Sequence, residues 1–291
     1  MKQTKSAFQN ATGKIDYTMT NDYMFRAVLQ ENKKVLIGLI CALLHLDCSK
    51  VKSVVILNPI ELGEAVDDKT FVLDIKVILN DAVIINIEMQ VLRQGFWQDR
   101  SLLYLCRAFD SLEKGDAYTE AKPAYHIGIL DFTPFLEHPE FYATNKMMNV
   151  KKHYIYNDKL TLNVLDLTQI DIATEEDKAY EIDYWAKLFK AKTWEELKMI
   201  AQKNDIFEET GETIFRLNQN DAVRYMCEAR EEGQRILKTY ETMLKESQRM
   251  LKTYEITLAE KNTALVAKDT ELAEKEALIA QLQAQLKEYR K

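Results

Sequence analysis

The chain has 291 residues and a formal net charge of −7, a length that suits one large domain with an appendage. Its longest apolar run, residues 35–46, is too short to span a bilayer, so we expect no membrane-spanning helix. Residues 1–14 contain no apolar stretch, so we also expect no signal peptide and a cytoplasmic location.

The first half of the chain alternates helical and extended patterns. Apolar residues three and four apart indicate a helix with Thr20 or Asn21 as its N-cap. The elements expected before residue 135 are, in chain order, a helix over 20–46, a strand over 51–57, two strands over 71–79 and 83–91, a helix over 97–114 ended by Gly115, and a strand over 125–132.

The second half is mostly helical in pattern. Its expected elements are, in chain order, hairpin strands over 152–156 and 159–167 that turn at Asn157–Asp158, helices over 175–190, 194–202 and 207–215, and a long helix from about residue 220. The predicted organisation is a mixed α/β core over residues 1–170, a helical extension over 171–230 and a tail over 231–291.

Cysteine and histidine residues form no recognisable metal motif. The cysteines are Cys41, Cys48, Cys106 and Cys227, which lie in apolar helical patterns. We expect them to be buried free thiols in a reducing compartment. The histidines are His45, His126, His138 and His153, which are scattered along the chain and are expected to be structural.

Two neighbouring strands carry the most informative pattern of the sequence. Both alternate, so that side chains of one kind share a face. The apolar faces hold Leu73, Ile75, Val77 and Leu79 on the first strand, and Val83, Ile85, Ile87, Met89 and Val91 on the second. The opposite faces hold Asp74 and Lys76, and Asn86, Glu88 and Gln90. Two carboxylates on one patch are typical of a divalent-metal site.

The loop between the strands sets their register. A three-residue loop over 80–82 pairs Asp74 with Glu88 and Lys76 with Asn86, whereas a two-residue loop would bury one polar face. Opposed Cβ atoms lie about 5 Å apart, and carboxylates that close repel unless a cation binds between them or one is protonated. The alternative is that these polar residues form the hydrated face of an antiparallel sheet.

The ordered set of these and neighbouring residues resembles a known nuclease group. The matching pieces are Met19 to Phe25, Asp68-Lys69, Leu73-Asp74, Asn86-Ile-Glu88-Met-Gln90, Arg100 with Tyr104, Gly115 through Tyr118 to Pro123, and Tyr125 to Leu130. Together they resemble the PD-(D/E)XK nuclease family transposases, also called recombination-promoting nucleases. The resemblance covers residues 17–135 well and implies a restriction-endonuclease-like α-β-β-β-α-β core and cleavage of DNA linked to recombination or mobile elements.

The resemblance implies a metal-dependent mechanism centred on the two strands. Asp74, Glu88 and the backbone carbonyl of Met89 would hold Mg²⁺ or Mn²⁺, without any small-molecule cofactor. Gln90 stands where the family usually has Lys; it can orient a water molecule but carries no positive charge. Lys76 is expected either to supply that charge or to form a salt bridge with Asp74 or Glu88.

Further candidates lie around this centre. Asp22 is expected either to add an acidic group or to act as a first-turn acid favoured by the helix dipole. Arg100 is expected to contact DNA phosphate or to brace a carboxylate, and Tyr104 to pack or to offer its hydroxyl. Lys69 is a possible additional site residue.

An acidic chain is an unusual binder of a polyanion. The segment from Glu231 to Lys291 holds 11 acidic and 11 basic residues, so the body carries the whole net charge of −7. Only the field near the site matters for binding, so a local basic groove remains compatible with this total. The candidates for such a groove are Lys69, Lys76, Arg93, Arg100 and Arg107.

The tail carries a heptad repeat. The segment Gln234–Glu241 is echoed fourteen residues later, and an apolar residue recurs every seven residues. These residues are Leu237, Leu244, Leu251, Leu258, Leu265, Leu272, Ile279 and Leu286. The pattern predicts a coiled coil and a homo-oligomer through residues 234–291, against the alternative of a solitary charged helix. Gln90 in the usual Lys position and the acidic body leave a second hypothesis open, in which the nuclease fold is catalytically weak and the protein is a binding or assembly module that works through this coiled coil.

Overall fold

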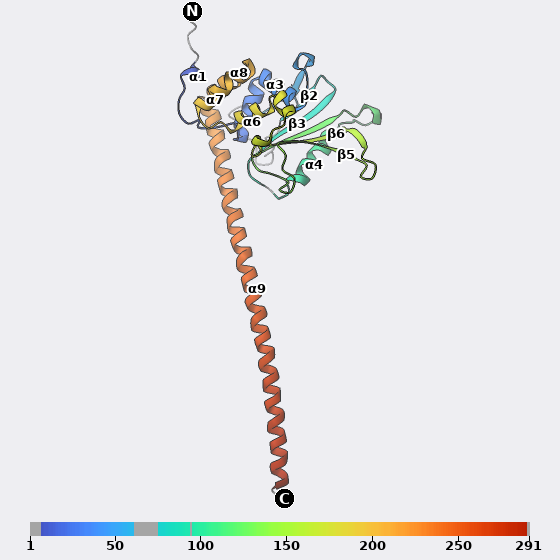
Figure 1. Cartoon of the computed structure of the whole chain (residues 1–291), viewed down its shortest axis with the longest axis vertical. Coiled ribbons are helices and arrows are strands. Elements are labelled where there is room, and N and C mark those ends of the chain that lie inside the picture. Colours follow the sequence, from blue (N-terminus) through green and yellow to red (C-terminus); the bar gives the residue numbers. More distant parts are fainter. Residues whose placement is uncertain (1–6, 61–74, 94, 290–291) are drawn as a thin grey trace, which may run out of the picture. The chain divides into compact units, whose positions relative to one another are not determined.

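The computed structural model describes residues 7–60, 75–93 and 95–289 (Figure 1). Backbone proximity groups residues 1–232 into one compact unit and residues 233–291 into a second. The first unit contains the sheet and most helices, and the second is a single helical segment. No helix in the described ranges is long and apolar enough to cross a membrane.

A six-stranded mixed sheet forms the centre of the first unit. Its strands are β1 (Val54–Ile56), β2 (Ile75–Leu79), β3 (Val83–Gln90), β4 (Ala124–Leu130), β5 (Tyr142–Met148) and β6 (Ile155–Asp166). Their order across the sheet is β1-β2-β3-β4-β6-β5. The pairs β3–β4 and β4–β6 are parallel, and the others are antiparallel.

Nine α-helices accompany the sheet in the described residues. They are α1 (Ala7–Asn10), α2 (Asp22–Glu31), α3 (Lys33–Leu43), α4 (Trp97–Phe109), α5 (Glu175–Ala179), α6 (Ile182–Lys190), α7 (Trp194–Ala201), α8 (Asp205–Asn218) and α9 (Asp221–Tyr289). Short 3₁₀ turns lie at Cys48–Lys50, Tyr118–Glu120 and Ile170–Ile172. The expected mixed α/β class and the α-β-β-β-α-β order are confirmed by helices α2 and α3, strands β1 to β3, helix α4 and strand β4.

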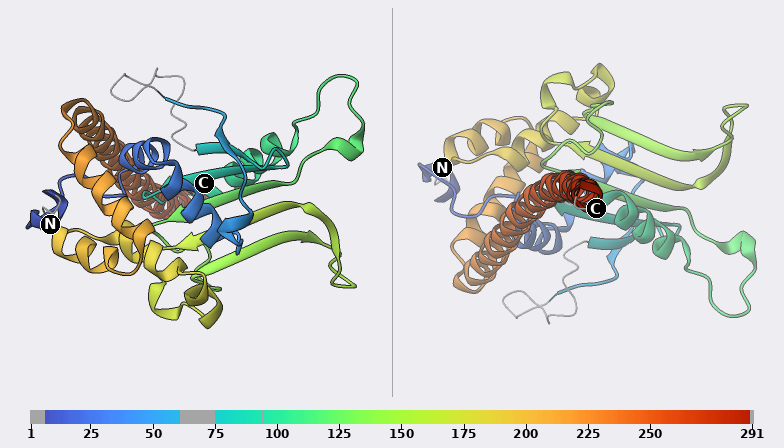
Figure 2. Two further views of the ribbon diagram at one scale, coloured as in Figure 1. Left: turned by 90° about the horizontal axis from the view of Figure 1, so that it is seen from above. Right: turned by 90° about the horizontal axis from the view of Figure 1, so that it is seen from below.

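Helices cover both faces of the sheet, as the two views of Figure 2 show. One face carries Ile75, Ile85 and Ile87, which pack in a large core with residues of α2, α3, α6, α7 and α8. The other face carries Ile84 and Ala124, which pack against α4. Strand β3 is therefore buried on both sides, which is unusual for a strand that holds Asn86, Glu88 and Gln90.

The predicted register of the β2–β3 hairpin is confirmed in the described residues. Ile75 pairs with Ile87, Lys76 with Asn86 and Val77 with Ile85. Asn80 and Asp81 both adopt positive φ angles, which Asn and Asp tolerate better than other side chains do. Asp74 and its expected pairing with Glu88 lie outside the described residues.

The helix expected over residues 20–46 is two helices. Asn21 caps the first, as predicted, by accepting hydrogen bonds from the backbone N–H groups of Tyr23 and Met24. Asn32 then leaves the helical conformation and caps α3 by accepting from the N–H groups of Lys34 and Val35. An Asn side chain competes well for backbone donors at such a position, and the apolar periodicity does not reveal the break.

Helix α4 ends at Phe109 rather than at Lys114. The last turn keeps Leu105 and Ala108 buried against the sheet, whereas residues 110–116 are mostly polar and, apart from the half-buried Leu112, are exposed. Gly115 has a φ angle of 110° and lies in the turn that follows, where Asp116 accepts a hydrogen bond from the N–H of Glu113 at 2.8 Å.

The prediction of a hairpin that turns at Asn157–Asp158 is wrong. These residues lie inside β6, which runs without interruption from Ile155 to Asp166 and pairs with β5. The turn lies at residues 149–154 instead, where the side chain of Asn149 accepts from the N–H groups of Lys151 and Lys152 at 3.1 and 2.8 Å. Asn157 accepts from the N–H of Lys159, and the pairing with β5 is irregular there.

The expected helix over 175–190 is also divided. Glu181 adopts a left-handed conformation with φ of 59°, which separates α5 from α6. The expectation that all four cysteines are buried was wrong as well, since Cys41 and Cys227 are buried but Cys48 and Cys106 are exposed. Cys48 follows the end of α3, and Cys106 lies on the outer side of α4.

Candidate functional site on strand β3

The candidate site is built around the carboxylate of Glu88. This residue lies near the C-terminal end of β3, between β2 and β4, and is only 8% exposed. Burial of an ionised carboxylate costs several kcal/mol unless a charged or hydrogen-bonded partner compensates for it. The neighbours of Glu88 therefore decide whether this position holds a charge.

Arg100 provides the charge that compensates Glu88. It lies one turn into α4 and donates hydrogen bonds from one terminal nitrogen to Oε1 of Glu88 and to Oε1 of Gln90, the latter at 2.5 Å. The guanidinium group also lies 6.0 Å from the ring centroid of Tyr104. Of the two roles expected for Arg100, the structure shows the contact with the carboxylate.

The start of α4 approaches the sheet closely at a glycine. Gly128 of β4 pairs with Glu88, and the indole ring of Trp97 lies directly over Gly128. A Cβ atom at position 128 would lie 2.5 Å from the ring. The absence of a side chain at this position thus lets the first residue of α4 rest on the sheet beside Glu88.

His126 is a neighbour of Glu88 that the sequence interpretation missed as a site residue. It is completely buried, its Nδ1 lies 3.1 Å from the amide nitrogen of Asn86, and its Nε2 lies 3.7 Å from Oε2 of Glu88. Burial, and secondarily the charge of Arg100, lowers the pKa of His126 to about 3, so the ring is neutral at physiological pH. The parallel pairing of β3 with β4 brings His126 here, and no local sequence pattern reveals that pairing.

Three other predicted site residues, Lys76, Gln90 and Tyr104, lie on or beside the same face of the sheet. Lys76 is half-buried opposite Asn86, as the register predicts. Gln90 uses both ends of its amide, since Nε2 donates to the carbonyl of Leu92 at 2.8 Å and Oε1 accepts from Arg100. Tyr104 lies 6.0 Å from the ring of His126, so its ring packs over the site.

Asp22 is engaged in an ion pair with α9. Nε of Arg230 donates to Oδ1 of Asp22 at 3.0 Å, and a terminal nitrogen of the same guanidinium contacts Oδ2. Asp22 is the first residue of α2 and is almost fully buried. In this arrangement the carboxylate fixes the first turns of α9 to α2 and corresponds to the first-turn acid of the two expected roles.

A hard divalent cation fits the buried carboxylate of Glu88 but needs more oxygen donors than this one group. Among the described residues no three His, Cys, Asp or Glu side chains lie close enough to share an ion. Asp74 and Lys69, the other predicted members, lie outside the described residues. The described part of the site therefore supplies the carboxylate of Glu88, the amides of Asn86 and Gln90, the imidazole of His126 and the guanidinium of Arg100.

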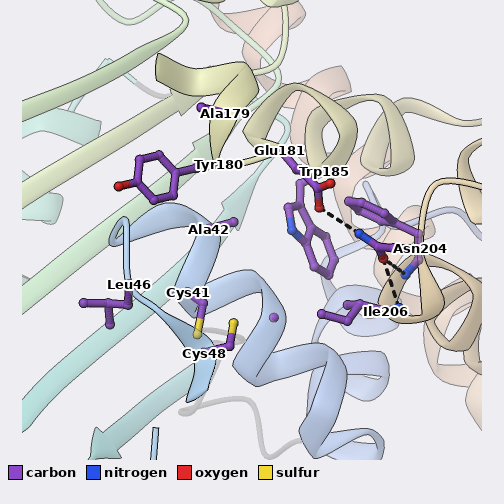
Figure 3. A pocket seen from close by; sticks show the side chains of 12 residues that line it. Cys41, Ala42, Leu46, Cys48, Ala179, Tyr180, Glu181, Trp185, Asn204 and Ile206 are labelled. Atoms are coloured by element: carbon purple, nitrogen blue, oxygen red, sulfur yellow. Dashed lines mark hydrogen bonds between the residues drawn. The ribbon is translucent and has the colours of Figure 1, made fainter. Parts of the chain in front are cut away.

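A pocket in another part of the first unit is distinct from this site (Figure 3). Its lining residues are Gly38, Cys41, Ala42, Leu46, Cys48, Ala179, Tyr180, Glu181, Trp185, Asn204, Ile206 and Phe207. Neither Glu88 nor Arg100 contributes to it, so it offers no substrate cavity for the candidate site.

Comparison with protein-family models matches residues 19–241 to the PD-(D/E)XK nuclease family transposases. No curated protein and no solved structure matches the chain significantly. The matched segment includes the described parts of β2, β3 and α4, and it extends into α9. Proteins with this nuclease fold typically use divalent metal ions. The chain therefore belongs to the PD-(D/E)XK nuclease family transposases.

Proposed function

We propose that the protein is a metal-dependent DNA endonuclease that hydrolyses phosphodiester bonds at the site around Glu88. The observation that supports this most directly is the buried Glu88 carboxylate, which lies mid-strand with Arg100, Gln90 and His126 around it. A charged carboxylate at such a position is costly, and a wholly structural strand would hold an apolar residue there.

The proposed metal site combines Glu88, Asp74 and the backbone carbonyl of Met89. Mg²⁺ or Mn²⁺, when bound, polarises a phosphoryl oxygen and lowers the pKa of a bound water. Both ions prefer oxygen ligands of this kind and leave positions for water and phosphate. No small-molecule cofactor is part of the proposal, and DNA is the proposed partner.

The remaining residues are proposed to prepare the site for the phosphate. Arg100 pairs with the Glu88 carboxylate in the free protein and can move one of its nitrogens to a phosphate oxygen when DNA binds. Gln90 is oriented by Arg100 and Leu92 and is proposed to position the attacking water. Lys76, on the same face, is proposed to stabilise the negative charge that develops on the phosphate. His126 is neutral and orients Asn86 and Glu88.

The tail is proposed to form a homo-oligomer through residues 234–291. Its heptad residues Leu244, Leu258 and Leu265 are each 58–60% exposed in the single chain. A continuous stripe of exposed apolar side chains along one helix is stabilised when a second helix covers it. The proposed oligomer is compatible with the nuclease and with the second candidate function below.

The second candidate function is a binding or assembly module with a weak catalytic site. Gln90 replaces the usual Lys, and Arg100 occupies one oxygen of Glu88. Both observations would lower activity without affecting DNA binding or tail association.

Nicking of supercoiled plasmid separates the two functions. The wild-type protein is incubated with Mg²⁺, with Mn²⁺ and with EDTA, beside the variants Glu88→Gln and Asp74→Asn. The exposed carboxylate Glu137 provides a matched control, Glu137→Gln, which removes one charge far along the chain from the site. The nuclease proposal expects nicking that requires metal, is lost in both site variants and is retained in the control. Nicking unaffected by Glu88→Gln, or no nicking with any metal, contradicts it.

A further inference from the structure

The turn between β5 and β6 gathers positive charge in an otherwise acidic chain. Residues 146–156, here called the hairpin tip, contain three lysines and one histidine but no acidic residue. Lys146, Lys151 and Lys152 are all exposed. Because the whole chain carries −7, the hairpin tip is a local exception of the kind that a polyanion recognises.

The hairpin tip also exposes aromatic and aliphatic side chains. Tyr154 is 55% exposed, Tyr156 is 73% exposed and Val150 is 82% exposed. Several exposed side chains with large apolar surfaces in one turn are typical of a contact surface. Tyrosine next to lysine suits nucleic acid, because the ring packs on sugars and bases while the ammonium groups bind phosphates.

Hydrogen bonds within the turn fix the backbone of the hairpin tip. Asn149 accepts two backbone hydrogen bonds, and its own N–H donates to the carbonyl of Tyr154 at 2.8 Å. The pairing of β5 with β6 shifts at Met147 and again at Met148, an irregularity that increases local twist. Lys159 donates to the carbonyls of Thr119 and Ala121 at 3.2 and 2.7 Å, which ties the hairpin to the loop after α4.

The hairpin tip projects from the sheet in the direction away from the carboxyl ends of β3, β4 and β6. Figure 2 shows it extending beyond the helical layers. Glu88 pairs with Gly128, which pairs with Val164 of β6, and eight residues separate Val164 from Tyr156. At about 3.3 Å per residue, Tyr156 lies about 26 Å along the strand from the row of Glu88. This distance corresponds to about eight base pairs at about 3.4 Å each.

We propose that the hairpin tip is a duplex DNA-binding element that enters a groove about eight base pairs from the scissile phosphate. A two-stranded ribbon fits the major groove of B-form DNA. Lys146, Lys151 and Lys152 contact phosphates, and Tyr154 and Tyr156 contact sugars and base edges. This inference rests on the proposed function only in taking DNA as the partner; the binding itself needs neither metal nor catalysis.

The test measures binding of the full-length protein to a fluorescein-labelled 30-base-pair duplex in EDTA, over a range of salt concentrations. One variant is Lys151→Ala with Lys152→Ala, and a second is Tyr154→Ala with Tyr156→Ala. The matched control, Lys50→Ala with Lys52→Ala, removes the same charge from two exposed lysines elsewhere. Circular dichroism checks that each variant is folded.

The lysine variant is expected to bind at least tenfold more weakly at low salt, with a salt dependence reduced by about two phosphate contacts. The tyrosine variant is expected to bind at least fivefold more weakly with an unchanged salt dependence, and the control to change less than twofold. Equal affinities of the lysine variant and its control overturn the inference. So does a change confined to oligomeric state, or binding of the hairpin tip to anionic vesicles but not to DNA.

The inference and the proposed function fail separately. Glu88→Gln is expected to abolish nicking, and adding the two lysine substitutions to it is expected to weaken duplex binding as much as they do in the wild-type protein. Metal-dependent nicking with normal binding by the hairpin variants would refute the inference alone. Binding through the hairpin tip without nicking under any condition would refute the endonuclease proposal alone.

Discussion

Arg100 of α4 contacts Glu88 of β3 through a buried ion pair, so the position of a helix and the charge of a strand residue depend on each other. The same guanidinium nitrogen contacts Gln90. Removal of one partner would leave the other charge buried, and such losses typically cost several kcal/mol. This pair therefore contributes to folding as well as to the proposed chemistry.

The first prediction concerns this pair. Arg100→Met keeps much of the side-chain volume but removes the guanidinium charge from the Glu88 carboxylate, so we expect the free energy of unfolding to fall by about 3 kcal/mol. The double variant with Glu88→Gln removes both charges and should recover more than half of that loss. Urea denaturation measures both values. A single variant as stable as the wild-type protein would show that the ion pair makes no net contribution.

A second prediction concerns the attachment of α9. Asp22→Asn breaks the buried contact with Arg230 and should destabilise the protein by about 2 kcal/mol. Asp16 and Arg224 form an exposed pair at 3.5 Å, which supplies a matched comparison. Asp16→Asn should change stability by less than about 0.5 kcal/mol, because exposed pairs contribute little. Similar losses in both variants, measured by thermal denaturation, would contradict the role assigned to Asp22.

The cysteines give a prediction about pH. Burial, helped by a hydrogen bond that the Cys41 thiol donates to Cys48, raises the pKa of Cys41 to about 12, and burial also raises the pKa of Cys227. The thiolate is the reactive form, so both should resist alkylation in the native protein. At pH 8, iodoacetamide should modify Cys48 and Cys106 within minutes and the other two only after denaturation. Because a raised thiol pKa favours the neutral folded state, this stabilisation should be lost progressively as pH rises above about 9. Mass spectrometry of tryptic peptides identifies the modified residues, and rapid native labelling of Cys41 would refute the prediction.

The heptad pattern predicts the orientation of the proposed oligomer. In a parallel pair, Lys261, Lys268 and Lys275 would each face their own copies in consecutive layers. In an antiparallel pair centred near residue 263, each lysine faces a leucine, and Leu244 faces Leu282. The antiparallel arrangement avoids three like-charge contacts, so we expect it to form.

Cysteine cross-linking tests this orientation in a background where Cys48 and Cys106 are replaced by serine. Leu244→Cys mixed with Leu282→Cys should form a disulfide dimer, and Leu244→Cys alone should not. Efficient cross-linking of Leu244→Cys with itself would indicate the parallel arrangement, and a monomer by light scattering would refute the oligomer.

The sequence was most informative where local periodicity and sheet register coincide. The alternation around Lys76 and Glu88 predicted the β2–β3 pairing, because a slip by one residue would bury the polar side chains against the main core. Asn21 was predictable as a cap because its side chain bonds to backbone N–H groups only two and three residues further along the chain.

Features that depend on distant segments were not predictable in the same way. Asn157–Asp158 has the composition of a turn, yet pairing of Asn157 with Met147 of β5 keeps it within β6. The position of His126 beside Glu88 depends on a parallel alignment that joins segments forty residues apart. The first helix ends at Asn32 because the side chain of this residue accepts hydrogen bonds from the first turn of α3. An Asn side chain can also point to solvent within a continuous helix, and the local sequence does not show which of the two occurs.

The lack of a side chain at Gly128 is a structural requirement of the proposed site. An added methyl group at this position would meet the indole of Trp97 and displace the origin of α4 by a fraction of an ångström or more. Arg100 lies one turn further along α4, so the displacement would move its guanidinium group and weaken the contact with Glu88. A conservative change to alanine, at a residue that has no reacting atom of its own, would thereby disturb the proposed site through the main chain of a helix.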